Sequence, residues 1–175
     1  MVISYVRLHC PLEEAKSRYS RWIGAAEVEP ARLVPEGEKI DLALADGDEW
    51  AGLTVFIYPS ASWTVIDDLS GGLAPRSPDS WLELAQDGDL VYAAYNDAVP
   101  YAELIVVQQG KLVRRFLQDE QDPSDNVNEG RLPEEAKDPF EHWPDVAAWV
   151  DEDSEKLEPV EQGWLWIHEA TDRPE

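Results

Sequence analysis

Residues 63–117 read WTVIDDLSGGLAPRSPDSWLELAQDGDLVYAAYNDAVPYAELIVVQQGKLVRRFL and contain most of the candidate core. Within them, Ser77 stands directly before Pro78 and Asp79. This order is typical of a helix start, because a serine oxygen accepts from free backbone amides and proline suits the first turn. An acidic side chain is also favoured there by the helix dipole. We therefore predict a short strand at 63–66 followed by a helix that begins at Pro78 and ends at Gly88.

The second half of the same stretch predicts three strands. Residues 90–95, 101–108 and 111–117 are rich in Val, Ile, Leu and Tyr, which favour strands. The last two runs are separated by Gln109-Gly110, and glycine permits the positive φ that a tight hairpin requires. The pattern predicts a β-hairpin here.

Before this stretch, residues 2–8 alternate in a way that predicts a strand. A helix follows, with Pro11 and two acids at its start and apolar residues at helical spacing. Gly24 is a natural helix end. The next segment, residues 25–37, contains two prolines and mixed charge and is predicted to be a connection.

Residues 40–45 alternate between apolar and other residues, and residues 50–58 are rich in Val, Phe, Ile and Tyr. Both runs are predicted to be strands. Asp46-Gly47-Asp48 between them has the composition of a turn. The two runs are therefore expected to pair as a hairpin.

The composition changes after Leu117. Residues 119–158 contain 15 acids against 3 bases. Residues 118–141 combine this acidity with several Pro and Gly, which predicts a mostly irregular segment, either mobile or wrapped on the sheet. A short helix is expected from Pro144, a last strand at 164–167 and a tail at 171–175.

Together these elements predict one α+β domain over residues 1–175. We expect a mainly antiparallel sheet of about six strands with three helices packed on one face. The length of 175 residues and 43% hydrophobic content fit one domain with its own core. One cysteine excludes an internal disulfide and is compatible with a reducing compartment.

The net charge of −23 limits the classes of partner that the chain is expected to bind. A field of this sign repels nucleic acid and anionic membranes and attracts cationic proteins. The first residues lack the pattern of a secretory signal, and no apolar run is long enough to span a membrane. The expected location is the cytoplasm, and the expected partner is a cationic protein.

Known catalytic and metal-binding motifs are not found in the sequence. The three histidines are far apart, and DEQDPSDNVN at 119–128 lacks the spacing of a calcium loop. Gly71-Gly72 is predicted to be a structural turn and not a phosphate loop, and Cys10 a buried residue and not a nucleophile. No cofactor or metal is expected.

The strongest functional pattern is a set of acids and aromatic or polar residues near predicted turns of the sheet. Aromatic side chains supply contact area, while acids steer a basic partner and fix its register. The predicted partner-binding residues are Asp67, Asp68, Tyr95, Asn96, Asp97, Glu103, Asp119, Glu120, Asp122 and Asp125.

Three sequence segments resemble those of small bacterial proteins: WTVIDDLSGG at 63–72, YNDAVPYAELIVV at 95–107 and HWPDVAAWVDED at 142–153. With the acidity and the missing catalytic motifs, the chain resembles the immunity proteins that bacteria encode beside secreted or polymorphic antibacterial toxins. The resemblance implies tight binding to a cognate toxin without catalysis. A nuclease toxin would fit, because its substrate groove is basic.

Two alternatives follow from the same residues. One is a hydrolase whose site is assembled from dispersed carboxylates; a deep pocket with two carboxylates in unlike environments would support it. The other is a non-catalytic accessory or scaffold domain for a different basic partner.

Overall fold

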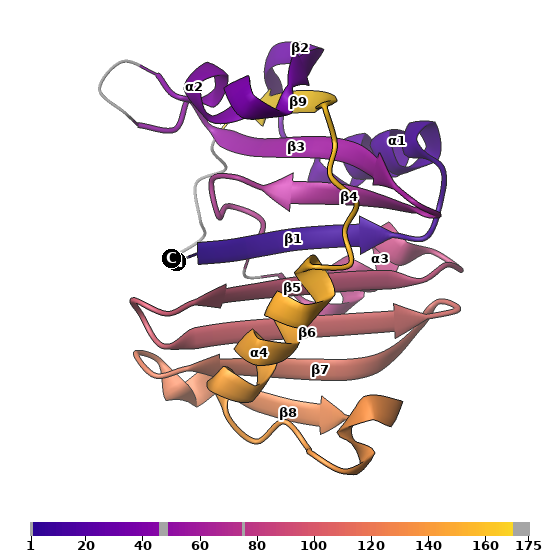
Figure 1. The fold of residues 1–175 in the computed structure, drawn as a ribbon, viewed down its shortest axis with the longest axis vertical. Coiled ribbons are helices and arrows are strands. Elements are labelled where there is room, and N and C mark those ends of the chain that lie inside the picture. Colours follow the sequence, from indigo (N-terminus) through magenta and orange to yellow (C-terminus); the bar gives the residue numbers. More distant parts are fainter. Residues whose placement is uncertain (1, 46–48, 75, 170–175) are drawn as a thin grey trace.

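The computed structural model of the chain describes residues 2–45, 49–74 and 76–169 (Figure 1). The turn predicted at 46–48 and the tail predicted at 171–175 lie outside these residues. The strands are β1 (Val2–Leu8), β2 (Glu27–Pro35), β3 (Leu53–Ser60), β4 (Trp63–Asp68), β5 (Leu90–Asn96), β6 (Tyr101–Gln108), β7 (Lys111–Asp119), β8 (Val127–Gly130) and β9 (Gln162–His168). The α-helices are α1 (Leu12–Ile23), α2 (Lys39–Ala43), α3 (Pro78–Ala85) and α4 (Trp143–Ser154). Short 3-10 turns cover Glu36–Glu38, Pro123–Asp125 and Pro133–Ala136.

The strands form one sheet in the order β2-β9-β3-β4-β1-β5-β6-β7-β8 (Figure 1), and every neighbouring pair is antiparallel. The predicted α+β class with a mainly antiparallel sheet is confirmed. Within the described residues the sheet has nine strands and not about six, and there are four helices and not three. The last strand, β9, lies between β2 and β3, so the end of the described chain packs in the half of the sheet that holds β2 and β3.

Helices cover both faces of the sheet. In Figure 1, α4 crosses in front of β5, β6 and β7, whereas α1 and α3 lie behind the sheet. The prediction that the helices pack on one face is wrong, because the central strands are apolar on both faces. In β5, Tyr92 packs in the cluster that contains α1 and α3, whereas Val91 packs with Val146 of α4.

Aromatic contacts hold α1 and α3 together on their face. The ring of Trp81 in α3 stacks on Tyr92 with centroids 4.3 Å apart, and Trp22 of α1 contacts Trp81 at 5.2 Å. The indole N–H of Trp22 also donates to the carbonyl of Ser80 at 2.7 Å. Tryptophan buries much apolar area and needs a partner for its one donor, and Trp22 meets both conditions here.

Several local predictions are confirmed. Gly24 ends α1 with a φ of 63°. The hydroxyl of Ser77 caps α3 by accepting from the amide of Ser80 at 3.3 Å. Gln109 and Gly110 have φ values of 50° and 70°, the left-handed pair that a two-residue hairpin turn between β6 and β7 requires.

The connection predicted at 25–37 is wrong for most of its length, because residues 27–35 form β2. This strand lies at the sheet edge and pairs with β9 alone among the described strands, so most of its side chains are exposed. An edge strand tolerates proline and charge. Its sequence therefore lacks the alternation that identifies a half-buried strand.

The strand predicted at 40–45 is wrong as well, because Lys39–Ala43 forms α2. Leu44 and Trp50 share an isolated bridge, but the expected hairpin with residues 50–58 is not formed. β3 begins at Leu53 and pairs instead with β4 and β9. A short apolar run fits a helix turn and a strand equally well, so its neighbours in the fold determine which one forms.

The segment 118–141, predicted to be mostly irregular, contains the strand β8. Within this segment, β8 pairs with β7 through backbone hydrogen bonds, and the side chains of β8 are largely exposed. The sequence of β8 therefore has no apolar pattern that would identify a strand. The rest of the segment is wrapped on the sheet, which was one of the two predicted forms. No helix among the described residues has both the length and the apolar character needed to cross a membrane.

Candidate ligand-binding site

A pocket of about 490 Å³ opens where several strands begin or end, on the face that carries α1 and α3. β1 and β6 begin on this side of the sheet and β5 and β7 end there, on the left in Figure 1. The size of the pocket falls in the range of roughly 300–1,000 Å³ that is usual for small-molecule sites. The antiparallel order therefore brings residues of four strands, β1, β5, β6 and β7, to a single pocket.

Strand register places the pocket residues in a row. Asn96 of β5 is opposite Tyr101 of β6, and Tyr101 is opposite Asp119 of β7. The side-chain oxygen of Asn96 accepts from the amide of Ala98 at 3.0 Å, a contact that favours the turn between β5 and β6. All three row members line the pocket.

A buried carboxyl lies next to the pocket, behind Tyr101. Glu103 is 4% exposed and its carboxylate accepts the hydroxyl proton of Tyr101 at 2.6 Å. Burial raises the pKa of Glu103 to about 7, although the Tyr101 hydroxyl and the charge of Arg115 both act in the opposite direction. Close to neutral pH this carboxyl therefore exchanges between its two protonation states.

Tyr92 completes the buried group. It is fully buried and lines the pocket, and its hydroxyl lies within hydrogen-bonding reach of Ser4, Tyr101 and Glu103. None of these contacts has the geometry of a standard hydrogen bond. A buried hydroxyl whose hydrogen bonds are poorly formed costs free energy, so a better-placed donor would stabilise it.

Asp68 organises the loop that forms another wall of the pocket. Its carboxylate accepts from the hydroxyl of Ser4 at 3.1 Å and from the amides of Gly72 and Leu73 at 3.0 Å each. Burial raises the pKa of Asp68, and these hydrogen bonds lower it in part. The amides of the Gly71-Gly72 turn thus bind a carboxylate of the protein itself, which fits the prediction of a structural turn.

Three carboxylates form the acidic rim, which we define as Asp119, Asp122 and Asp125; all three line the pocket. Local contacts hold their loop: Asp119 accepts from the amide of Gln121 at 2.8 Å, and Asp122 accepts from the hydroxyl of Ser124 at 2.6 Å. Within residues 2–45, 49–74 and 76–169, none of the three has an ion pair. The rim therefore presents uncompensated negative charge to solvent.

Seven of the ten predicted partner-binding residues lie at this pocket. Five line it, namely Tyr95, Asn96, Asp119, Asp122 and Asp125. The side chain of Tyr95, however, is 5% exposed and packs in the cluster on the α4 face, where its hydroxyl donates to Asp151 at 2.7 Å. Asp68 and Glu103 are buried beside the pocket at 5% and 4% exposure. These two carboxylates do not form a surface for a protein partner, because a side chain buried in this way is inaccessible to a macromolecule.

The other three predicted residues do not line the pocket. Asp67 points to the opposite face of β4 from Asp68 and contacts the ammonium of Lys39 at 2.8 Å. Asp97 is exposed in the turn between β5 and β6, and Glu120 is exposed beyond β7. Alternation along a strand separates Asp67 from Asp68, which adjacency in the sequence had grouped together.

The sequence interpretation missed Ser4, Tyr92 and Tyr101. Tyr92 and Tyr101 were assigned only to strands, and Ser4 only to one face of β1. A usable pattern exists in β6, where Tyr101, Glu103, Ile105 and Val107 share one face at period two. A single acid among apolar residues on a buried face indicates a polar contact with neighbouring strands.

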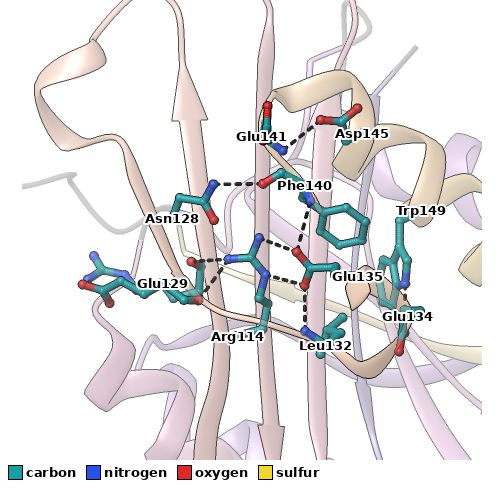
Figure 2. Close-up of polar contacts among 11 residues, drawn as sticks. Arg114, Asn128, Glu129, Leu132, Glu134, Glu135, Phe140, Glu141, Asp145 and Trp149 are labelled. Carbon is teal, nitrogen blue, oxygen red and sulfur yellow. Dashed lines mark hydrogen bonds and ion pairs between the residues drawn. The ribbon is translucent and has the colours of Figure 1, made fainter. Parts of the chain in front are cut away.

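The opposite face holds a second polar cluster (Figure 2). Arg114 of β7 and Glu135 are each 1% exposed, and two guanidinium nitrogens donate to the Glu135 carboxylate at 2.8 and 2.9 Å. Glu135 also accepts from the amides of Leu132 and Phe140 at 2.7 and 3.2 Å. Arg114 donates further to the carbonyl of Glu129 at 3.0 Å. These contacts are all internal to the protein, so this cluster fixes the 131–141 segment on the sheet and is not a ligand site.

Two other candidate chemistries lack support in the structure. Cys10 is buried, and burial raises the pKa of its thiol, which disfavours the nucleophilic thiolate. Among the described residues, no three His, Cys, Asp or Glu side chains are placed to hold a metal ion.

Comparison of the chain with models of known families, with curated proteins and with solved structures found no match.

Proposed function

We propose that this protein is an immunity-type binding protein that neutralises a cationic antibacterial toxin without catalysis. The observation that carries the proposal is the acidic rim at the mouth of an open pocket. Three carboxylates that form no ion pair with any described residue face solvent there, in a chain of net charge −23. Such a surface attracts a basic partner over long range and orients it as it docks.

The pocket adds specificity to this attraction. A rim of charge alone binds any basic protein, whereas a hollow of about 490 Å³ accepts only a side chain of fitting shape. Partly apolar walls from Ala94 and Leu117 stand beside the polar groups. Interfaces derive most of their affinity from a few side chains buried in such pockets.

The same geometry favours binding over hydrolysis. Two carboxylates in unlike environments do lie at or beside the pocket, Asp119 half-buried at the rim and Glu103 buried next to it. However, Glu103 is not among the residues that line the pocket, and its carboxylate is engaged by Tyr101. A general acid or base must reach the reacting atom of the substrate, and this carboxyl lies behind another side chain.

The proposal is tested with two triple variants of equal charge change. The rim variant is D119N/D122N/D125N, and the control variant E38Q/E83Q/E152Q changes three exposed acids that do not line the pocket. Each tagged protein is used to capture partners from a lysate of the source cells at low and moderate salt. The captured protein is then expressed in bacteria with and without each variant.

We expect one dominant basic protein to bind the wild-type and control proteins and to bind the rim variant much less. We also expect its expression to stop growth unless the wild-type or control protein is present. Capture that is equal for both variants, or a partner that is harmless when expressed alone, would contradict the proposal.

A further inference from the structure

The pocket contains binding groups that a general acidic surface does not need. The Tyr92 hydroxyl is fully buried, lines the pocket and has no hydrogen bond of standard geometry among the described residues. Beside it, the Tyr101 oxygen donates its proton to Glu103 at 2.6 Å and keeps its lone pairs. Two phenol residues, Tyr92 and Tyr101, and the three carboxylates of the acidic rim therefore line the same pocket and carry hydrogen-bond acceptors.

From this arrangement we propose that the pocket is a specific site for a guanidinium group on a short alkyl stem. A planar guanidinium has five N–H donors in a fixed fork, which suits several acceptors at different heights in one hollow. Its weakly hydrated face packs against aromatic and aliphatic walls, which Tyr92, Ala94 and Leu117 supply. An ammonium group is more strongly hydrated and loses more on entering such a pocket.

The charges around the pocket agree with a cationic ligand. Among the described residues, no cation forms an ion pair with the rim carboxylates, and the carboxyl of Glu103 adds negative charge behind Tyr101 when it ionises. Two arginines lie near, but Arg115 contacts Glu129 at 3.9 Å and Arg76 lies over the ring of Trp22 at 4.2 Å. Neither is among the residues that line the pocket.

The inference rests on the proposed function for the source of the group, which would be an arginine side chain of the cationic partner. A free guanidinium compound has the same chemistry. The site itself, however, is tested without any partner. The probe is ethylguanidinium chloride, and the matched neutral probe is ethylurea, which has a similar shape without the charge.

Backbone amide NMR spectra of the whole chain are recorded with each probe at constant ionic strength. We expect saturable shifts at Asn96, Tyr101 and Asp119 with ethylguanidinium, with a dissociation constant that is roughly millimolar, as suits so small a ligand. Ethylurea should bind at least tenfold more weakly, since it cannot form charge-assisted hydrogen bonds.

Variant Y92F removes only the Tyr92 hydroxyl and should weaken the binding of ethylguanidinium about tenfold, the effect of one hydrogen bond with a charged donor. Variant Y19F is the control, because Tyr19 is also a buried phenol of the same core but is not in the pocket. Unsaturable shifts, equal binding of both probes, or equal effects of Y92F and Y19F would overturn the site.

A competition experiment separates the two proposals. If ethylguanidinium displaces the captured partner, an arginine of that partner fills the pocket. If ethylguanidinium binds but displaces nothing, the guanidinium site stands with a free small molecule as its ligand. If the partner binds and the probe does not, the guanidinium site is wrong while the immunity function stands.

Discussion

Glu103 occupies a position on β6 where its neighbours on the same face, Ile105 and Val107, are fully buried and apolar. Burial disfavours the charged form of a carboxyl, and one hydrogen bond from Tyr101 compensates only in part. Its folded-state pKa of about 7 lies above the ordinary value of 4.5. The ionised residue therefore costs stability at neutral pH, and a cation in the pocket would offset that cost.

The pH dependence of this cost has a definite sign. Below pH 4.5 the carboxyl is protonated in both the folded and unfolded states and costs nothing. Between pH 4.5 and 7 the unfolded state releases its proton first, so the free energy of unfolding falls. Variant E103Q should therefore be more stable than wild type by up to about 3 kcal/mol at pH 8 and nearly equal to it at pH 4.5.

Urea unfolding followed by tryptophan fluorescence at several pH values measures this difference. Variant E120Q is the control, because Glu120 is exposed and its neutralisation should shift stability by less than about 0.5 kcal/mol at every pH. A difference between E103Q and wild type that does not change with pH would show that Glu103 keeps an ordinary pKa.

Residues of this kind mark the limit of sequence interpretation. The acids of the rim were predicted because Asp119, Asp122 and Asp125 cluster in the sequence next to a strand end. Tyr92 and Tyr101 were missed because a tyrosine in a strand is compatible with the core, and only strand pairing shows that their hydroxyls meet. Asp67 was grouped with Asp68, but alternation sends it to the other face.

At the scale of elements, the buried pair of Arg114 and Glu135 holds the segment between β8 and α4 on the sheet (Figure 2). A buried ion pair contributes little net stability against an apolar pair of equal shape, but loss of one partner leaves an uncompensated buried charge. The carboxylate also satisfies the amides of Leu132 and Phe140. Loss of Glu135 thus affects a charge and two backbone groups together.

Variant E135L should lower the free energy of unfolding by roughly 3–5 kcal/mol. The control is E29L, which removes the exposed pair of Glu29 and Arg32 on β2, and should change it by less than about 1 kcal/mol. Urea unfolding of both variants checks the difference. An equal cost for the two variants would mean that the segment is held by other contacts.

A helix or strand could be predicted from the sequence when its own residues, and not its contacts with the rest of the fold, determine its structure. α1 and α3 and the hairpin of β6 and β7 have caps and turn residues in the sequence, and each was predicted. β2 and β8 are edge strands with exposed side chains, so their sequences carry no alternation. α2 was predicted to be a strand because a run of five or six residues fits either period.

At the scale of the whole molecule, the antiparallel order gathers strand ends that are distant in the sequence. Ser4, Tyr92 and Asp119 come from β1, β5 and β7 and meet at one pocket. Neither this order nor the placement of helices on both faces follows from local patterns, because each depends on which strands pair. The charge of −23, by contrast, is a property of the sequence alone.

We propose that the acidic rim, and not the net charge as a whole, receives the cationic partner. The association rate constant of the captured partner, measured at increasing salt for wild type, the rim variant and the control variant, distinguishes the two. Both variants have a net charge of −20, since each neutralises three acids of a chain with charge −23.

We predict that the wild-type and control proteins associate fast at low salt and slow down steeply as salt screens the charges. The rim variant should associate several-fold more slowly at low salt and depend less on salt. Equal rates and equal salt dependence for the two variants would contradict the claim, because the partner would then respond to total charge and not to the rim.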